Sequence, residues 1–101
     1  MAAAQLDPVI HAPARLHICA LLSGVDEAEF AVVREEVEVS DSVLSKHLKQ
    51  LEDAGYVRLR KATVASRQRT WLSLTRAGRF AFKAHMAELN RLVAPSSRRA
   101  E

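Results

Sequence analysis

The stretch that decides the fold runs from Ser40 to Val57 and reads SDSVLSKHLKQLEDAGYV. Ser40 can accept hydrogen bonds from the free N–H groups of a first helical turn, and Val39 can pack onto Leu44. Leucines at positions 44, 48 and 51 lie on one helical face, and Gly55 is a typical helix stop. The stretch therefore predicts an amphipathic helix over about residues 40–54, with a narrow buried stripe.

The opposite side of this predicted helix gathers small polar, cationic and amide side chains near its N-terminal half. A DNA major groove would suit such a face, because phosphates and base-edge acceptors both lie within its reach. A plain solvated face is the alternative reading, and the histidine of this face could instead hydrogen-bond to a neighbouring helix. The candidate DNA-contacting residues of the helix are Ser42, Val43, Ser45, Lys46, His47 and Lys49.

Charge is unevenly distributed along the 101 residues, which are enough for one domain with a modest core. Residues 1–42 carry two Lys or Arg against eight Asp or Glu, whereas residues 43–83 carry ten against two. A concentrated basic block is the electrostatic footprint of a polyanion binder. A single cysteine, Cys19, and the lack of a signal peptide or an 18-residue apolar run favour a cytoplasmic protein with no membrane contact.

The residues before the central stretch read as a series of short helices. Asp7-Pro8 predicts a helical turn to about His11, and Pro13 begins a main first helix that ends near Ser23-Gly24. Asp26 and Glu29 form a capping-box pattern, which predicts a second helix from about Ala28 to Val37. Since two residues separate that helix from Ser40, the pair forms a predicted helix-turn-helix.

The residues after Gly55 change to a period of two. Residues 57–64 and 70–74 predict two strands of a β-hairpin wing, joined by a cationic tip at residues 65–69 that contains Arg67 and Arg69. These arginines suit a phosphate or a narrow minor groove, whereas Trp71 is expected to be structural. Thr75 is expected to cap a long last helix, and Gly78 to let it approach the sheet closely. Residues 1–6 are predicted to be a flexible N-terminus and 94–101 a disordered tail, flanking a domain at 7–93.

The last helix carries more apolar surface than one thin three-helix core can cover. Each side chain left in water would forgo roughly 1.5–3 kcal/mol of burial, so a second copy is the expected cover. We expect an isologous two-fold interface, with the two recognition helices about 34 Å apart on a near-palindromic site. The predicted interface residues are Leu16, Phe82, Met86, Leu89, Leu92 and Val93. The alternative is that part of this stripe packs on its own domain.

Catalysis and cofactor binding have little support in the sequence. It lacks HExxH, CxxC, GxSxG and glycine-rich phosphate-loop motifs, so we expect neither an enzyme nor a bound cofactor. His17, Cys19 and His85 could in principle meet, but their spacing resembles no ligand motif, and no metal site is predicted. Cys19 is interpreted as a small buried hydrophobe, and the sequence leaves a sensing role for it open.

Three stretches together resemble a known family: DPVIHAPARLHICALL, SVLSKHLKQLEDAGYV and RQRTWLSLTRAGRFAF. The chain is similar to small MarR-like or ArsR-like winged helix-turn-helix transcriptional regulators, although Ala65-Ser66 stands at the wing tip where such proteins often have glycine. The resemblance implies a mainly α fold with a β-hairpin wing and a long C-terminal dimerisation helix. It also implies a homodimeric regulator, expected to be a repressor, that binds specific double-stranded DNA sequences. The recognition helix would enter the major groove, and the wing at residues 64–69 would contact the backbone or minor groove.

Two other functions remain open at the level of sequence. A winged helix whose basic face only confers solubility could bind a protein, and would then show no steep salt dependence with duplex DNA. The same surface could bind structured RNA, which competition between duplex DNA and RNA would reveal. The operator, the target genes and any small-molecule effector are not encoded in a recognisable pattern.

Overall fold

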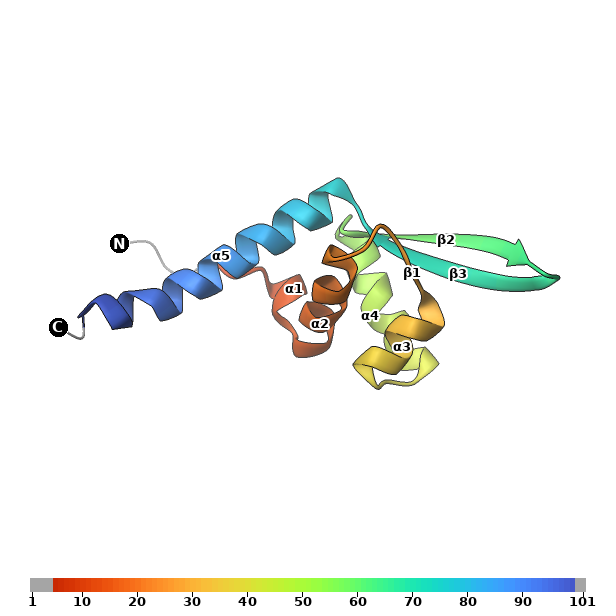
Figure 1. Ribbon diagram of the computed structural model, residues 1–101, viewed down its shortest axis with the longest axis horizontal. Coiled ribbons are helices and arrows are strands. Elements are labelled where there is room, and N and C mark those ends of the chain that lie inside the picture. The colour runs from red at the N-terminus through yellow and green to blue at the C-terminus, as the bar shows by residue number, and fades with distance from the viewer. Residues whose placement is uncertain (1–4, 100–101) are drawn as a thin grey trace.

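The computed structural model describes residues 5–99 and has an elongated shape, with extents of 62 × 23 × 22 Å. Three helices, α2, α3 and α4, gather at the centre, while a long hairpin extends to one side and the end of α5 to the other (Figure 1). The elements are α1 (Pro8–His11), α2 (Pro13–Ser23), β1 (Ala28–Glu29), α3 (Phe30–Val37), α4 (Asp41–Asp53), β2 (Val57–Val64), β3 (Arg67–Leu74) and α5 (Arg76–Arg99). The predicted winged helix architecture is confirmed.

The core lies where α1, α2, α3 and α4 meet the base of the sheet. All three leucines of the predicted stripe on α4 are at most 1% exposed, which confirms the inward face of that helix. The buried apolar side chains are Ile10, Ile18, Cys19, Leu22, Val33, Leu44, Leu48, Leu51, Val57, Leu72 and Leu74. Partly buried Val37, at the end of α3, and Val39, in the turn that follows it, pack against this cluster.

The expected start of the second helix at Ala28 is wrong. Ala28 and Glu29 form β1, which pairs antiparallel with Leu72 and Trp71 of β3 and gives a sheet of order β1-β3-β2. The helix begins at Phe30 instead, and the residue before it makes no side-chain capping bond. Pairing with the edge of β3 satisfies backbone groups that the capping box would otherwise have satisfied, so tertiary contacts override the local signal.

The wing is a regular hairpin with a shorter connection than predicted. β2 and β3 pair in continuous register from Val57 with Leu74 to Val64 with Arg67. The turn consists of Ala65 and Ser66, whose φ angles of 50° and 65° both lie in the left-handed region that two-residue hairpin turns require. The arginines at 67 and 69 therefore belong to β3 rather than to a loop, and side chains two residues apart share one face of the strand.

The end of α4 and the start of α5 are joined directly. Gly55 has a φ of 82°, and the Thr75 hydroxyl donates to its carbonyl oxygen over 2.6 Å. The same hydroxyl oxygen accepts from the Gly78 N–H at 3.0 Å, as the predicted cap requires. A Cβ atom at Gly78 would overlap the backbone carbonyl of Tyr56, which confirms the predicted close approach.

The last helix is longer than expected. α5 continues through Pro95 to Arg99, where the sequence predicts a disordered tail over residues 94–101. Proline removes one backbone N–H, but its fixed φ is compatible with helical backbone. At the other end, the Gln5 N–H donates to Glu88 Oε2 at 3.2 Å within the predicted flexible segment 1–6. Residues 1–4 and 100–101 of these two predicted segments lie outside the described range.

Candidate nucleic-acid interface

α4 holds its polar side away from the core. The three buried leucines fix its inner face, so the opposite face points outward. Five of the six predicted contact residues on this helix are exposed: Ser42, Val43, Ser45, Lys46 and Lys49. Val43, the apolar member, has 39% of its surface exposed. This side of the helix is therefore open to a partner, as the sequence predicts.

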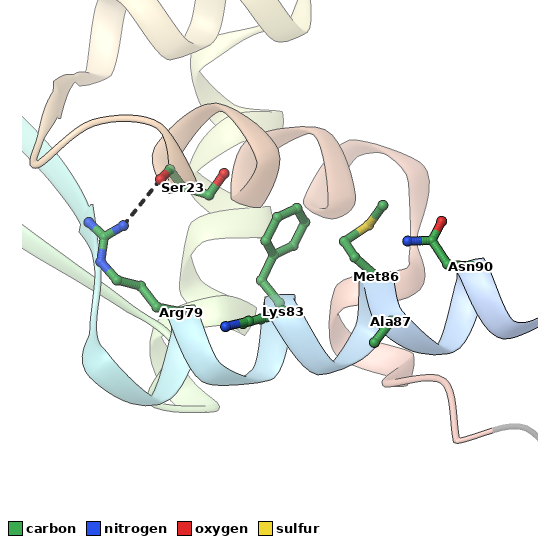
Figure 2. A pocket seen from close by; sticks show the side chains of 7 residues that line it. Ser23, Arg79, Lys83, Met86, Ala87 and Asn90 are labelled. Carbon is green, nitrogen blue, oxygen red and sulfur yellow. Dashed lines mark hydrogen bonds between the residues drawn. The ribbon is translucent and has the colours of Figure 1, made fainter.

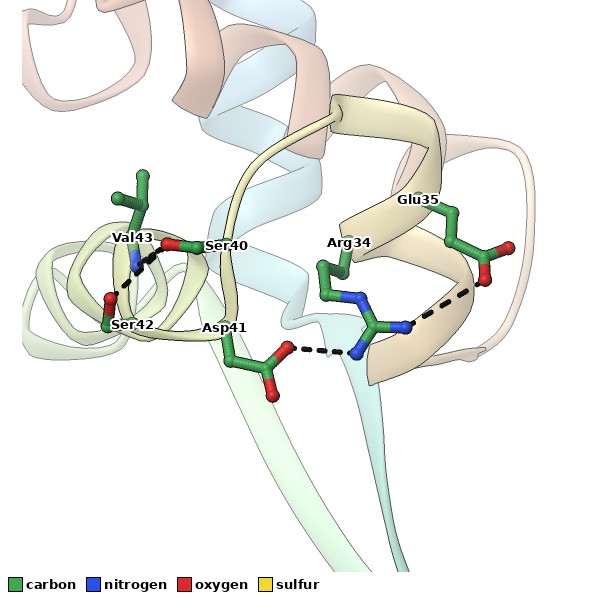
Figure 3. Close-up of polar contacts among 6 residues, drawn as sticks. All are labelled: Arg34, Glu35, Ser40, Asp41, Ser42 and Val43. Carbon is green, nitrogen blue, oxygen red and sulfur yellow. Dashed lines mark hydrogen bonds and ion pairs between the residues drawn. The ribbon is translucent and has the colours of Figure 1, made fainter.

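The N-terminus of α4 is fixed by two polar contacts (Figure 3). The Ser40 side chain accepts from the Val43 N–H at 3.2 Å, which confirms the predicted cap. Arg34 of α3 donates through Nη1 to Asp41 Oδ1 at 2.9 Å. The sequence analysis missed this ion pair. Its one signal in the sequence is Asp41, an acid in the first turn of the helix, where the helix dipole favours negative charge. The pair ties α3 to α4 and neutralises an acid beside the outward face.

His47 differs from the other predicted contact residues because it is half-buried. Its Nδ1 lies 3.3 Å from Nη1 of Arg15 on α2, and the Nε of Arg15 donates to the carbonyl oxygen of Val9. Burial lowers the pKa of His47, and the charges of Arg15 and Lys46 lower it further. The interaction with a neighbouring helix, one of the two readings left open by the sequence, is therefore present.

The wing arginines are not equivalent. Arg67 is exposed, whereas Arg69 is half-buried and donates from Nη1 to Glu29 Oε2 at 2.9 Å. Arg60 makes two hydrogen bonds to Glu27, at 2.9 and 2.7 Å, and its guanidinium lies 5.7 Å from the ring centroid of Trp71. The bonds from Arg60 hold the pKa of the Glu27 carboxyl below its ordinary value.

Ion pairs within the protein neutralise part of the basic block that the sequence contains. Acids from the loop before β1 and from β1 itself neutralise two wing cations, and Lys49 lies 3.3 Å from Asp53 on its own helix. Among the described residues, four basic side chains near α4 and the wing make no ion pair: Lys46, Arg58, Lys61 and Arg67. The unpaired cations of this region are thus one lysine on the outward side of α4 and three basic side chains along the hairpin.

A groove of about 470 Å³ lies between α4 and the wing. Its lining brings Ser45 of α4 to the same hollow as Lys61, Gln68 and Arg69 of the hairpin. Asp41 and Glu29 also line it, so the groove is mixed in charge. Of the predicted contact residues, Ser45 of the helix and Arg69 of the wing therefore meet in one groove.

The predicted interface residues differ in exposure. Leu16 of α2 and Phe82 of α5 are partly buried and pack against the chain's own core, as the alternative interpretation allowed. Met86 and Leu89 are also half-buried, whereas Leu92 is 45% and Val93 72% exposed. The sequence analysis missed Phe80, which is 76% exposed on the same helix.

A second groove of about 560 Å³ follows α5 beside the end of α2 (Figure 2). Phe82, Met86 and Ala87 supply its apolar lining, with Lys83 and Asn90 beside them. Arg79 at one end donates to the carbonyl oxygens of Ser23 and Val25, so its guanidinium is held by the backbone that follows α2.

A partly buried polar network, which we call the polar anchor, joins Asp7, His11, Tyr56 and His85. The Tyr56 hydroxyl donates to Asp7 Oδ2 at 2.6 Å, and Asp7 Oδ1 accepts from the first N–H groups of α1. His85 is 1% exposed; its Nδ1 accepts from the Asp7 N–H and its Nε2 lies 3.1 Å from His11 Nδ1. The anchor therefore ties α1, the end of α4 and α5 together.

The ionisation of the anchor follows from its burial and hydrogen bonds. Burial alone would raise the pKa of Asp7, but the bonds from Tyr56 and the α1 backbone outweigh it and hold that pKa below its ordinary value. The bond to Asp7 raises the pKa of Tyr56. Burial, reinforced by His11, lowers the pKa of His85, so this imidazole is neutral near pH 7. The sequence analysis considered His85 only with His17 and Cys19, for a metal site that it did not predict, and missed this network.

The residues considered for metal or thiol chemistry do not assemble. Within residues 5–99, no group of three or more histidine, cysteine, aspartate or glutamate side chains is arranged to hold a metal ion. Burial raises the pKa of the Cys19 thiol to about 11, far from the range of a reactive thiolate. None of the helices described is both long and apolar enough to span a membrane.

Comparisons with known proteins agree with this architecture. A family model described as a winged helix DNA-binding domain matches residues 14–93. An uncharacterised protein of Methanocaldococcus jannaschii is 34% identical over 84 residues, which cover 83% of this chain and 91% of that protein. A transcriptional regulator homologue from Pyrococcus horikoshii OT3 has a TM-score of 0.81 at 25% identity, over 86% of each chain.

A MarR family transcriptional regulator from Silicibacter pomeroyi is also similar, with a TM-score of 0.61 at 25% identity, over 91% of this chain and 66% of that one. The family match covers most of the helices and the entire wing, and these neighbours are regulators. The resemblance to MarR-like regulators is thereby confirmed. The chain belongs to the winged helix DNA-binding domain family and is a MarR-like, DNA-binding transcriptional regulator.

Proposed function

We propose that the protein is a repressor that binds specific duplex DNA sequences as a homodimer. α4 enters the major groove, and the wing lies on the backbone or in the minor groove. The observation that carries this proposal is the outward side of α4, which is exposed, polar and continuous with the basic hairpin. A bound dimer represses transcription by occupying the site that the transcription machinery needs.

The proposed contacts differ in kind. Lys46 and Arg67 are exposed and unpaired among the described residues, so each is free to meet a phosphate or a guanine edge. Arg69 reaches DNA only by sharing or leaving its bond to Glu29, and it acts mainly on the orientation of the wing. The full proposed contact set is Ser42, Val43, Ser45, Lys46, His47 and Lys49 of α4 with Arg67 and Arg69 of β3.

The proposed dimer uses α5. Its distal part extends beyond the helical core (Figure 1), and Leu92 keeps 45% of its surface in water. Phe80 and the apolar lining of the α5 groove add surface that a second copy can cover, at roughly 1.5–3 kcal/mol for each side chain fully buried. Two-fold pairing of α5 would present two α4 helices to successive turns of a near-palindromic site, about 34 Å apart.

The test of DNA binding first needs a duplex that the protein binds, and selection from random duplexes at a fixed salt concentration provides it. We expect Lys46→Ala and Arg67→Ala each to weaken binding by roughly 5-fold or more, with a log–log salt slope reduced by about one. Lys83→Ala removes the same charge from α5 and is the matched control. Wild-type binding by both Lys46→Ala and Arg67→Ala, or failure of the wild-type protein to select any duplex, would contradict the assignment.

Sedimentation at low micromolar concentration tests the dimer. Leu92→Glu places a charge on an exposed position of the protomer, so the fold is expected to survive while the dimer shifts towards monomer. Val32→Glu is the control, because Val32 of α3 is 52% exposed and lies away from α5. A wild-type sedimentation profile for Leu92→Glu would reject the proposed interface.

A further inference from the structure

Arg15 connects α1 to the proposed DNA-contacting face through two hydrogen bonds. Its Nε donates to the Val9 carbonyl oxygen, and its Nη1 lies 3.3 Å from Nδ1 of His47. The guanidinium is planar, so the first bond restricts where the second donor can point. Neither the charge pattern nor the helical period of the sequence distinguishes Arg15 as a residue of the DNA interface.

The bond to Arg15 determines where His47 carries its proton. A guanidinium can donate but not accept, so Nδ1 must present its lone pair and the neutral ring carries its hydrogen on Nε2. Burial and the charges of Arg15 and Lys46 keep the ring neutral near pH 7. Among the described residues, Arg69 Nε is the one side-chain nitrogen or oxygen that is buried without a hydrogen-bond partner. Since Nε2 of half-buried His47 also has no partner within residues 5–99, this nitrogen is not buried and is accessible from outside.

The position of His47 on α4 makes this N–H useful. One helical turn before it lies exposed Val43, and the adjacent residue is exposed Lys46, so the ring borders the open side on the flank that faces α2. Ser45 lies on the other flank, beside the wing. A donor at the α2 flank meets either a base-edge acceptor or a phosphate oxygen when α4 occupies a groove.

We propose that Arg15 is a positioning residue for DNA recognition, which holds His47 in the tautomer whose Nε2–H donates to an acceptor of the duplex. This inference rests on the proposed function, since it assumes that α4 contacts DNA. It adds a residue of α2 to the determinants of specificity. It also makes the contact depend on α1, whose Val9 carbonyl holds the guanidinium.

The variants separate positioning from direct contact. Arg15→Met keeps the apolar stem but removes the donors, and His47→Gln keeps an amide donor near the place of Nε2 without needing Arg15. We expect Arg15→Met and His47→Ala to weaken selected-duplex binding to a similar extent, roughly 3- to 10-fold, as for loss of one hydrogen bond. In the His47→Gln background, Arg15→Met should have little further effect. If Arg15 instead touches a phosphate itself, its loss will multiply with that of His47→Ala and lower the salt slope by about one, which overturns the proposal.

Nitrogen-15 spectra of the free protein's imidazole rings supply a readout independent of DNA. We expect one tautomer for His47 in the wild-type protein and a mixture in Arg15→Met and Arg15→Gln. An unchanged single tautomer in both variants, or wild-type DNA affinity in Arg15→Met, overturns the inference. Because Lys46→Ala reports on DNA contact by α4, a sensitive Lys46 with an insensitive Arg15 rejects the inference alone, whereas a wild-type protein that binds no duplex rejects the proposed function.

Thermal melting shows whether Arg15→Met still folds. If Arg15→Met does not fold, His47→Ala and His47→Gln test the proposed donor at Nε2, since both variants leave the contact between Arg15 and Val9 intact. The proposal then requires that the alanine variant loses affinity and that the glutamine variant keeps it. The two sources of the acceptor give different results in repeat selections. A base contact relaxes the preference at one position when His47 is replaced, whereas a phosphate contact weakens all sequences alike.

Discussion

The polar anchor and the outward side of α4 are both clusters of polar groups, but their partners differ. In the anchor, every oxygen of Asp7 and both ring nitrogens of His85 meet a partner inside the protein. On the outward side of α4, the side chains of Ser45 and Lys46 are exposed and make no hydrogen bond or ion pair to other described residues. Satisfied polar groups stabilise the fold, whereas unsatisfied exposed groups remain available for a ligand.

The wing lies between these two extremes. Arg60 and Arg69 are paired with acids of the protein's own N-terminal half, while Arg67 is exposed. Paired cations orient the hairpin and unpaired ones extend towards a polyanion. Substitutions in the anchor should therefore act mainly on stability, those on the outward side of α4 mainly on DNA binding, and those at the wing pairs only slightly on either.

The largest expected effect belongs to Asp7→Ala. The variant loses the cap of α1 and the carboxylate that accepts from Tyr56, for a combined cost of about 2–4 kcal/mol in unfolding free energy. Urea denaturation measures this loss, and Tyr56→Phe, which leaves the cap intact, should cost less. DNA affinity at a temperature where the variants are folded should equal that of the wild type in Tyr56→Phe. Asp7→Ala should in addition lose some affinity, because it releases the cap of α1, whose Val9 carbonyl oxygen holds Arg15. A clear loss of affinity in Tyr56→Phe would mean that the anchor itself shapes the DNA-binding face.

The next effect is a dependence of stability on pH. Because the pKa of buried His85 lies below the ordinary 6.5, the unfolded chain takes up a proton that the native protein refuses. Stability is therefore full above pH 6.5 and falls as the pH drops below it, by at most about 1.4 kcal/mol per pH unit for one histidine. His47 acts in the same direction.

Denaturation between about pH 5 and 7 isolates this effect, because the carboxylates with lowered pKa values respond only at more acidic pH. His85→Asn keeps an acceptor for the Asp7 N–H but does not titrate. Its stability should therefore fall less steeply over the same range. An equal slope in both proteins would show that His85 takes up its proton without opening the anchor.

A smaller effect is expected when the wing pair is broken from its acidic side. Glu29→Gln removes the partner of half-buried Arg69, so a cation is freed beside the groove that Ser45 also lines. We expect duplex affinity to rise a few-fold at low salt and the salt slope to steepen by about one. Stability should change by less than about 1 kcal/mol. Weaker binding would show instead that the loss of the wing's orientation outweighs the gain from the freed charge.

The smallest effect is expected for Arg60→Met. The pair with Glu27 is solvent-exposed, and the contact with Trp71 is long, so only a small loss of stability is expected. The salt dependence of DNA binding should not change, since this guanidinium is already neutralised. A slope reduced by one in this variant would place Arg60 among the DNA contacts and remove the distinction between paired and unpaired arginines.

The sequence predicted best where local signals and burial agree. Ser40, the three leucines of α4 and Gly55 all favour the same helix, and the alternation from Val57 predicts a strand that pairs along its full length. The start of α3 was mispredicted, because Ala28 and Glu29 pair with a strand more than 40 residues later. No local signal can report such a distant partner.

Partners across long separations also explain what the sequence left unresolved at the site. Its charge count indicated a basic block correctly, but not that Glu27 and Glu29 fold back onto Arg60 and Arg69. Arg15 and Arg34 were counted simply as charges. Their contacts with His47 and Asp41 depend on how α2 and α3 cross α4, which the helical period alone does not fix.

The seating of α5 on the end of α4 has a mechanical consequence. With no side chain at Gly78 and with Thr75 bonded to the Gly55 carbonyl oxygen, the backbone at the start of α5 lies directly against the backbone of the turn that follows α4. A rotation of α5 is therefore transmitted through this turn to α4. In the proposed dimer, a small rotation of one α5 against the α5 of the second copy would directly change the distance between the two α4 helices.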